Sequence, residues 1–299
     1  MISAESVKAR LKNKAKDNGR LFQDVLITYC LERTIYRLSI SEYNNLFTLK
    51  GGIFLYALFE GDFSRVTSDI DLLGNNIENS VDQMRAIFSA IFTIETDDAI
   101  VFDLETLHIK SITEFKEYTG INISVVAKLD KTKIPVSIDI GFGDIVYPKR
   151  ILMEFPTLLE MEVAKIYSYS IETVVAEKLE AIVSLGYVNS RYKDFYDIYI
   201  LCKEYDFDGK DLASAIRITF KHRKTELNDI VAFESDFISD KNRQQRWKSF
   251  IKKKRAMEQV EFASLIDVIR AFLLPVIISI KKDASYEENW QSKSLKWIK

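Results

Sequence analysis

The alternation of apolar and polar positions divides the chain into a part with helices and strands and a later part with helices. Helical spacing covers residues 3–18 and 21–37, and a short strand, "LFTLK", then leads to a short apolar helix over 53–59. A second strand, "TSDIDLLG", precedes a helix over 79–93. The period then changes to two in "VFDLETLHIKSI", "GINISVVAKL" and "IPVSIDIGFGD", which predicts three strands, the last two joined by the turn "DKTK".

From about residue 155 onward, the clear segments have helical spacing. We predict helices over 171–185, 193–205 and 209–223, and two more near 241–255 and 259–280. This layout indicates an α+β fold, in which a mixed sheet flanked by helices is followed by a mainly α-helical C-terminal part. The expected domains are residues 1–155, which include the sheet and the N-terminal helices, and residues 156–299.

Composition narrows the class of protein but does not name a partner. The net charge of −2 predicts neither a nucleic-acid nor a membrane partner, so any such partner needs a local patch. Cys30 and Cys202 lie in apolar stretches without metal-ligand spacing, as buried thiols do in a reducing compartment. The N-terminus has no apolar signal region, and the run "VIRAFLLPVIISI" is too short to span a bilayer and contains Arg270 and Pro275. We therefore expect a cytoplasmic protein without a membrane partner.

Two aspartates one residue apart, Asp69 and Asp71, lie in the strand "TSDIDLLG". Residues i and i+2 of a strand point to the same face, so the two carboxylates lie close together and repel each other unless a cation lies between them. Oxygen ligands of this kind suit Mg²⁺ or Mn²⁺. An exposed strand edge carrying two acids is the alternative interpretation.

Gly51 and Gly52 stand at the junction between the strand "LFTLK" and the helix that follows. Glycine lets a phosphate approach the backbone, and the free N–H groups at the start of a helix attract anions. A tight turn that requires a positive φ would explain the same pair of residues.

A third acid, Asp139, lies in the strand "VSIDIGFGD", on the face opposite Val136, Ile138 and Ile140. If its strand is a neighbour of the strand with Asp69 and Asp71, the three carboxylates can share one or two metal ions. An acid that faces water from an edge strand is the alternative.

The order of these features resembles the DNA polymerase β-type nucleotidyltransferase superfamily. More narrowly, "LKGGIFL" and "FSRVTSDIDLL" resemble the first block of the AbiEii/AbiGii-type toxin nucleotidyltransferases. The second block of that family is similar to "VAEKLEAIVSLGYVNSRYKDFYDIYIL", so the resemblance covers about residues 46–202. It implies a nucleotidyltransferase-type mixed sheet, with a helical part that contributes Lys178 and Asp194 to the cleft.

The resemblance also implies roles for single residues. Asp69 and Asp71 would hold Mg²⁺, with Asp139 as a third, less closely matched ligand. Lys178 would contact the triphosphate, and Asp194 corresponds to the acid of the second block. The implied nucleotide-binding residues are Lys50, Gly51, Gly52, Arg65, Ser68 and Lys178. The sequence departs from the family at Ile53, where many members have a hydroxyl side chain.

The run "KNRQQRWKSFIKKKRAMEQ" carries the highest density of basic residues. A solvated helix face is the ordinary explanation of such a run. A surface for the phosphate backbone of a nucleic acid is the alternative, with Trp247 available for base stacking. The residues expected at that surface are Arg246, Trp247, Lys252, Lys253 and Lys254.

Together these observations predict a metal-dependent nucleotidyltransferase that moves a nucleoside monophosphate from an NTP to an acceptor hydroxyl. The resemblance implies a toxin with a cognate antitoxin, and tRNA or another RNA as the acceptor. A protein or a small molecule as the acceptor stays open, as does a non-catalytic nucleotide- or nucleic-acid-binding module on the same fold. Glycosyltransferases also use Asp-x-Asp, but they do not account for the glycine pair or for Lys178. In haloacid-dehalogenase-type phosphatases the Asp-x-Asp follows an apolar strand near the N-terminus, whereas the preceding "FSRVTS" is polar here.

Overall fold

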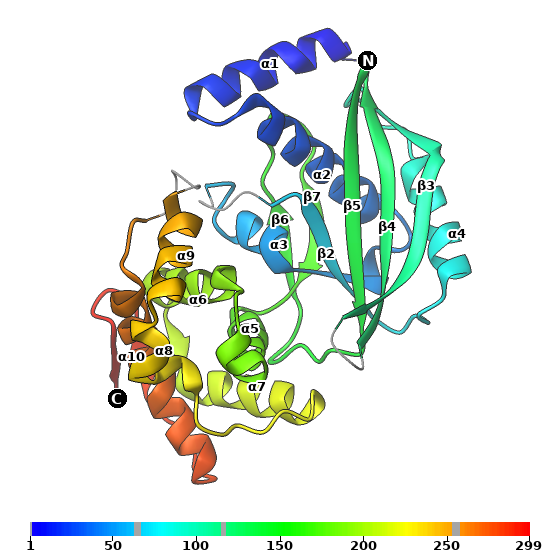
Figure 1. The fold of residues 1–299 in the computed structure, drawn as a ribbon. Helices are drawn as coiled ribbons and strands as arrows, with labels where there is room; N and C mark the ends of the chain where they lie inside the picture. The colour runs from blue at the N-terminus through cyan, green and yellow to red at the C-terminus, as the bar shows by residue number, and fades with distance from the viewer. Residues whose placement is uncertain (1, 63–66, 115–117, 253–257) are drawn as a thin grey trace. The chain divides into compact units, whose positions relative to one another are not determined.

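The computed structural model describes residues 2–62, 67–114, 118–252 and 258–299. It divides the chain into two compact units (Figure 1). Unit 1 comprises residues 1–143 and 151–169, and unit 2 comprises residues 144–150 and 170–299. This division differs from the expected boundary at residue 155, because two strands after residue 150 pair with the sheet of unit 1.

Unit 1 is built around a seven-stranded mixed sheet with the strand order β3-β4-β5-β2-β1-β7-β6. The pairs β2–β5 and β1–β7 are parallel, and the other four pairs are antiparallel. The strands are β1 (Phe47–Lys50), β2 (Asp69–Gly74), β3 (Ile100–Glu114), β4 (Tyr118–Leu129), β5 (Thr132–Phe142), β6 (Ile151–Phe155) and β7 (Ala164–Ser168). The helices are α1 (Ala4–Asp17), α2 (Phe22–Ile40), α3 (Gly51–Leu58), α4 (Val81–Phe92) and the 3-10 helix η1 (Asn44–Leu46).

The predicted elements of this unit are confirmed to within a few residues, but β6 and β7 were not predicted. Alternation explains the central strands, since Val136, Ile138 and Ile140 of β5 are buried and the residues between them are half-buried. Helix α2 packs against β5 and β7, α4 packs against β3, and α3 packs against β2 and β1 (Figure 1). The core of unit 1 therefore lies between the sheet and these helices.

Helix α2 also buries an ionic cluster in this core. Asp98, which is fully buried, accepts hydrogen bonds from Arg37 Nη1 at 2.6 Å and from Arg33 Nε at 3.0 Å. Burial alone would raise the pKa of Asp98, but the hydrogen bonds and charge of Arg37 hold it below its usual range. Glu32 accepts a hydrogen bond from the Leu158 N–H at 2.8 Å, yet burial raises its pKa to about 7. The cluster ties α2 to the segments before β3 and before β7.

Unit 2 is mainly helical, as predicted, with a three-stranded sheet of order β10-β9-β8 that was not predicted. Its long helices α5, α6 and α7 begin and end within one residue of the predicted bounds. The helices are α5 (Ile171–Leu185), α6 (Tyr192–Glu204), α7 (Gly209–His222), α8 (Ser235–Ser239), α9 (Lys241–Lys252), α10 (Phe262–Lys281) and the 3-10 helices η3 (Gly186–Val188) and η4 (Val231–Phe233). The strands are β8 (Phe207–Asp208), β9 (Asn289–Gln291) and β10 (Lys296–Ile298).

Helix α10 lies close to the predicted helix near 259–280, but it is longer than the apolar run that was expected to be too short to span a bilayer. With 20 residues, it is the one helix of the described chain that is long and apolar enough to cross a membrane by length and composition alone, a property that buried core helices share. Its apolar residues at helical spacing, including Leu265, Ile269 and Phe272, are buried in unit 2. The helix packs against α6 and α7.

Candidate active site

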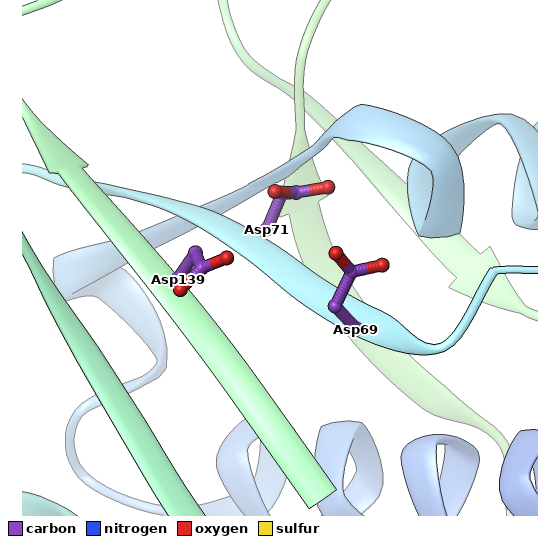
Figure 2. A group of neighbouring side chains, drawn as sticks. All are labelled: Asp69, Asp71 and Asp139. Atoms are coloured by element: carbon purple, nitrogen blue, oxygen red, sulfur yellow. The ribbon is translucent and has the colours of Figure 1, made fainter. Parts of the chain in front are cut away.

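The parallel pairing of β2 with β5 brings the three predicted aspartates together. Asp71 lies opposite Asp139 in the ladder, and Asp69 lies opposite Ser137. One carboxylate oxygen from each of the three aspartates lies within 4.8 Å of the other two. Figure 2 shows the three side chains gathered on one side of the two strands. The strand with Asp139 is therefore a neighbour of the strand with Asp69 and Asp71, as the sharing of a metal ion requires.

A row of polar side chains crosses the sheet at this level. Asn122 of β4 lies opposite Asp139, Asp139 opposite Asp71, and Asp71 opposite Lys50 of β1. The amide of Asn122 donates hydrogen bonds to Asp139 Oδ1 at 2.7 Å and to Ser137 Oγ at 3.0 Å. Directly opposite residues of a sheet share a face, so the row places an amide, two carboxylates and an ammonium side by side.

Asp69 has a hydrogen-bond donor close to it in sequence. The hydroxyl of Thr67, which is buried, donates to Asp69 Oδ1 at 3.0 Å. Ser68 is exposed, and Arg65 lies outside the described residues. The order "TSD" thus gives Asp69 a donor from the segment that leads into β2.

Gly51 is required for two reasons at the start of α3. Its φ is +67°, a conformation that L-residues with a side chain rarely adopt. A Cβ atom at this position would lie 1.9 Å from Asp71 Oδ2, which is a severe overlap. The glycine therefore makes room for the carboxylate as well as for the turn. Ile53 is fully buried, so this departure from the family pattern contributes to the core.

The side chain of Lys50 lies beside the carboxylate triad, which consists of Asp69, Asp71 and Asp139. Its Nζ lies 5.6 Å from the centre of the Tyr169 ring. A Cβ atom added to Gly141, which lies on the same face as Asp139, would be 3.3 Å from that Nζ. The ammonium group thus extends from β1 towards β5, and it brings a positive charge to the border of the acidic group.

The chemistry of this donor set fits a hard divalent cation. Three half-buried carboxylates offer oxygen ligands only, which favours Mg²⁺ or Mn²⁺ over metals that prefer nitrogen or sulfur. Carboxylates this close repel one another, and a cation between them removes that cost. Asp69, Asp71 and Asp139 are the residues that would hold it.

The residues of the second block form a compact ionic cluster within unit 2. Lys178 Nζ on α5 lies 3.1 Å from Asp194 Oδ1 and 2.7 Å from Asp197 Oδ2, both on α6. Arg191 Nε lies 2.6 Å from the other oxygen of Asp194. Both aspartates are buried, so two cations balance two buried anions. That Lys178 contacts a triphosphate, and that Asp194 contributes to catalysis, stay predictions.

The basic helix α9 differs from the prediction at its aromatic residue. Trp247 is 1% exposed, its indole N–H donates to the Val260 carbonyl at 2.8 Å, and its ring packs against Phe262. The prediction that Trp247 stacks on a base is therefore wrong, because the ring belongs to the core of unit 2. Arg246 and Lys252 are exposed, whereas Lys253 and Lys254 lie outside the described residues.

Three side chains that support the triad were not predicted from the sequence, namely Thr67, Asn122 and Ser137. A signal was present for Asn122, since the strand "GINISVVAKL" alternates Asn122 and Ser124 with buried Ile121 and Ile123. Alternation identifies the polar face of a strand, but it does not say which strand is the neighbour. The pairing of β4 with β5 supplies that information.

Comparisons with known proteins identify the family of the chain and structures with a similar fold. The family model described as "Nucleotidyl transferase AbiEii toxin, Type IV TA system" matches residues 33–267, a span that includes the triad and the second block. Among solved structures, JHP933 from Helicobacter pylori is similar in fold, with a TM-score of 0.50, 14% identity, and coverage of 87% of this chain and 94% of that one. A second H. pylori structure, of a candidate nucleotidyltransferase, has a TM-score of 0.50 and 15% identity, with coverage of 88% of this chain and 99% of that one. A comparison with curated proteins gave no match. Because the family model covers most of its length, the chain belongs to the AbiEii family of nucleotidyltransferase toxins.

Proposed function

We propose that the chain moves a nucleoside monophosphate from an NTP to a hydroxyl group of RNA, with tRNA as the acceptor, in a reaction that depends on Mg²⁺ or Mn²⁺. The observation that carries the proposal is the group of Asp69, Asp71 and Asp139, whose carboxylate oxygens lie within 4.8 Å of one another. A nucleotidyltransferase needs such a group, because its substrate carries a triphosphate whose charge must be neutralised.

The reaction forms a bond between the acceptor oxygen and the α-phosphorus and breaks the bond to the β-phosphate. The acceptor proton passes to solvent, and pyrophosphate leaves. A divalent ion at the aspartates would neutralise charge at the triphosphate and lower the pKa of the acceptor hydroxyl. Asp69, Asp71 and Asp139 would hold that ion, and Asn122 and Thr67 donate hydrogen bonds to Asp139 and Asp69.

The start of α3 gives the triphosphate its backbone donors in this proposal. The first N–H groups of a helix have no partner within the helix, and they attract anions. Gly51 and Gly52 occupy the first two positions of α3, directly after Lys50. We expect the amides of both glycines and the ammonium of Lys50 to face the phosphates, while Asp71 faces the metal.

An RNA acceptor is supported by the basic surface of α9, which exposes Arg246 and Lys252. Such side chains contact the phosphate backbone and make binding depend on salt. A cognate antitoxin follows from the type IV toxin–antitoxin description of the family. A toxin that modifies cellular RNA acts in the cytoplasm, which is where we expect this protein.

Transfer of label from each of four α-³²P-labelled NTPs to total RNA and to total protein tests this function. We expect label in RNA with Mg²⁺, no label with EDTA, and none with the Asp71→Ala variant. Label in protein or in a small molecule would overturn the RNA acceptor. Metal-dependent NTP binding without any transfer would identify a non-catalytic binding module and overturn the proposed reaction.

A further inference from the structure

Asn122 lies half-buried on β4, directly opposite Asp139 of β5. Its side-chain nitrogen donates to Asp139 Oδ1 at 2.7 Å and to Ser137 Oγ at 3.0 Å. An amide NH₂ group has two hydrogens, and these two bonds use both. The plane of the Asn122 amide is therefore fixed by two acceptors on the neighbouring strand.

The Asn122 bond acts on a carboxylate that its neighbour repels. Asp71 lies opposite Asp139 on β2, the neighbour of β5 on the side away from β4, and a carboxylate oxygen of Asp71 lies within 4.8 Å of one of Asp139. Repulsion between two anions favours rotation of the Asp139 carboxylate away from Asp71. A hydrogen bond to a charged acceptor is stronger than one between neutral groups, so the amide opposes this rotation.

We propose that Asn122 is a positioning residue for the metal site and holds the Asp139 carboxylate in the orientation in which it binds the cation. This inference rests on the proposed function, since it requires that the triad binds a metal. Groups that hydrogen-bond a metal ligand fix its orientation, and their loss typically weakens metal binding by roughly 10–100-fold. Thr67 has the corresponding bond to Asp69, from the segment before β2.

Titration with Mn²⁺, followed by the electron paramagnetic resonance signal of the free ion, tests the inference on the full chain. Asn122→Leu removes the donor and keeps a similar volume, and we expect it to bind Mn²⁺ about 10–100-fold more weakly than wild type. Ser124→Ala is the matched control, because Ser124 is also half-buried on the same face of β4, two residues from Asn122. We expect this control to bind Mn²⁺ as wild type does.

A second variant separates a lost hydrogen bond from a damaged strand. Asn122→Thr keeps a residue that favours β-structure, but its single hydroxyl hydrogen cannot serve both acceptors. We expect weakened Mn²⁺ binding with an unchanged midpoint of thermal unfolding in the metal-free protein. Wild-type Mn²⁺ affinity in Asn122→Leu, or in Asn122→Thr should the leucine variant fail to fold, would overturn the role of Asn122.

The Asp71→Ala variant distinguishes failure of this inference from failure of the proposed function. Loss of Mn²⁺ binding in Asp71→Ala together with full binding in the Asn122 variants would leave the metal site standing and remove the positioning role. Equal Mn²⁺ binding by wild type and Asp71→Ala would show that the triad is not the metal site. Both proposals would then fall.

Discussion

Replacement of Gly51 by alanine tests the close approach between the start of α3 and the Asp71 carboxylate. A left-handed backbone costs an alanine about 1–2 kcal/mol. The new Cβ would also lie 1.9 Å from Asp71 Oδ2 and 2.5 Å from Asp71 Cγ, and overpacking of this kind costs a further ~1–3 kcal/mol. We therefore expect Gly51→Ala to lower the free energy of unfolding by roughly 2–5 kcal/mol.

Gly19→Ala is the matched control for this change. Gly19 has a similar φ of +61°, lies in the same unit, and has no atom within 4 Å of an added Cβ. Its cost is therefore the backbone cost alone, about 1–2 kcal/mol. The effect of alanine on the unfolded chain is the same at both positions and cancels in the comparison.

Urea denaturation of the metal-free proteins measures both costs. In the Asp71→Ala background, Gly51→Ala should cost less than it does in wild type, because two of the three overlapping atoms are gone. Part of the overlap should persist, since Asp71 Cβ is only 2.7 Å from the added atom. Equal midpoints for Gly51→Ala and Gly19→Ala would refute the contact with Asp71.

Three further changes test other parts of the structure. Glu32→Gln should flatten the pH dependence of stability, because the pKa of Glu32 in the folded protein is about 7. A carboxyl group with a raised folded pKa stabilises the fold most at a pH below its unfolded pKa, and this contribution is lost as the pH rises through 7. Between pH 5 and pH 8 the loss amounts to roughly 2–3 kcal/mol. Lys178→Met should destabilise unit 2 by about 3 kcal/mol, because it removes the ammonium group that lies 2.7 Å from the buried carboxylate of Asp197, and adding Asp197→Leu should restore much of the loss. Joint replacement of Arg246 and Lys252 by glutamate should weaken RNA binding and lower its salt dependence by about one unit of slope for each lost phosphate contact.

Each of these three predictions has an outcome that would contradict it. Equal pH dependence in wild type and Glu32→Gln, from urea midpoints at pH 5 and pH 8, would remove Glu32 as the titrating group. A double variant as unstable as Lys178→Met alone would contradict the pairing with Asp197. For α9, the control is Lys282→Glu, an exposed lysine of the same unit, and an equal effect of this control on RNA binding would show that α9 is not the binding surface.

Regular elements with strong periodicity could be predicted from the sequence, and the short edge strand β6 could not. Helix α5 has a serine N-cap at Ser170 and continuous apolar spacing, so both of its ends were predicted. Strand β6 carries Ile151 and Leu152 with about half of their surfaces exposed, so its pattern does not alternate. An edge strand buries few of its side chains, so apolar and polar residues need not alternate along it.

The triad could be predicted in part because carboxylates two residues apart in a strand share a face. That Asp139 belongs to the neighbouring strand needed the parallel pairing of β2 with β5, which no local pattern contains. The buried charges of α2 show the same limit. Glu32, Arg33 and Arg37 would suit a solvated helix face, and only tertiary packing brings them to Asp98.

The central claim is that the carboxylate triad supports metal-dependent transfer of a nucleoside monophosphate. The most direct test compares α-³²P- and γ-³²P-labelled NTP in the same reaction with RNA, with Mg²⁺ or EDTA. We expect wild type to attach the α-label and not the γ-label to RNA, only with Mg²⁺, and we expect Asp71→Ala to attach neither. Attachment of the γ-label, or α-label transfer that survives both EDTA and Asp71→Ala, would contradict it.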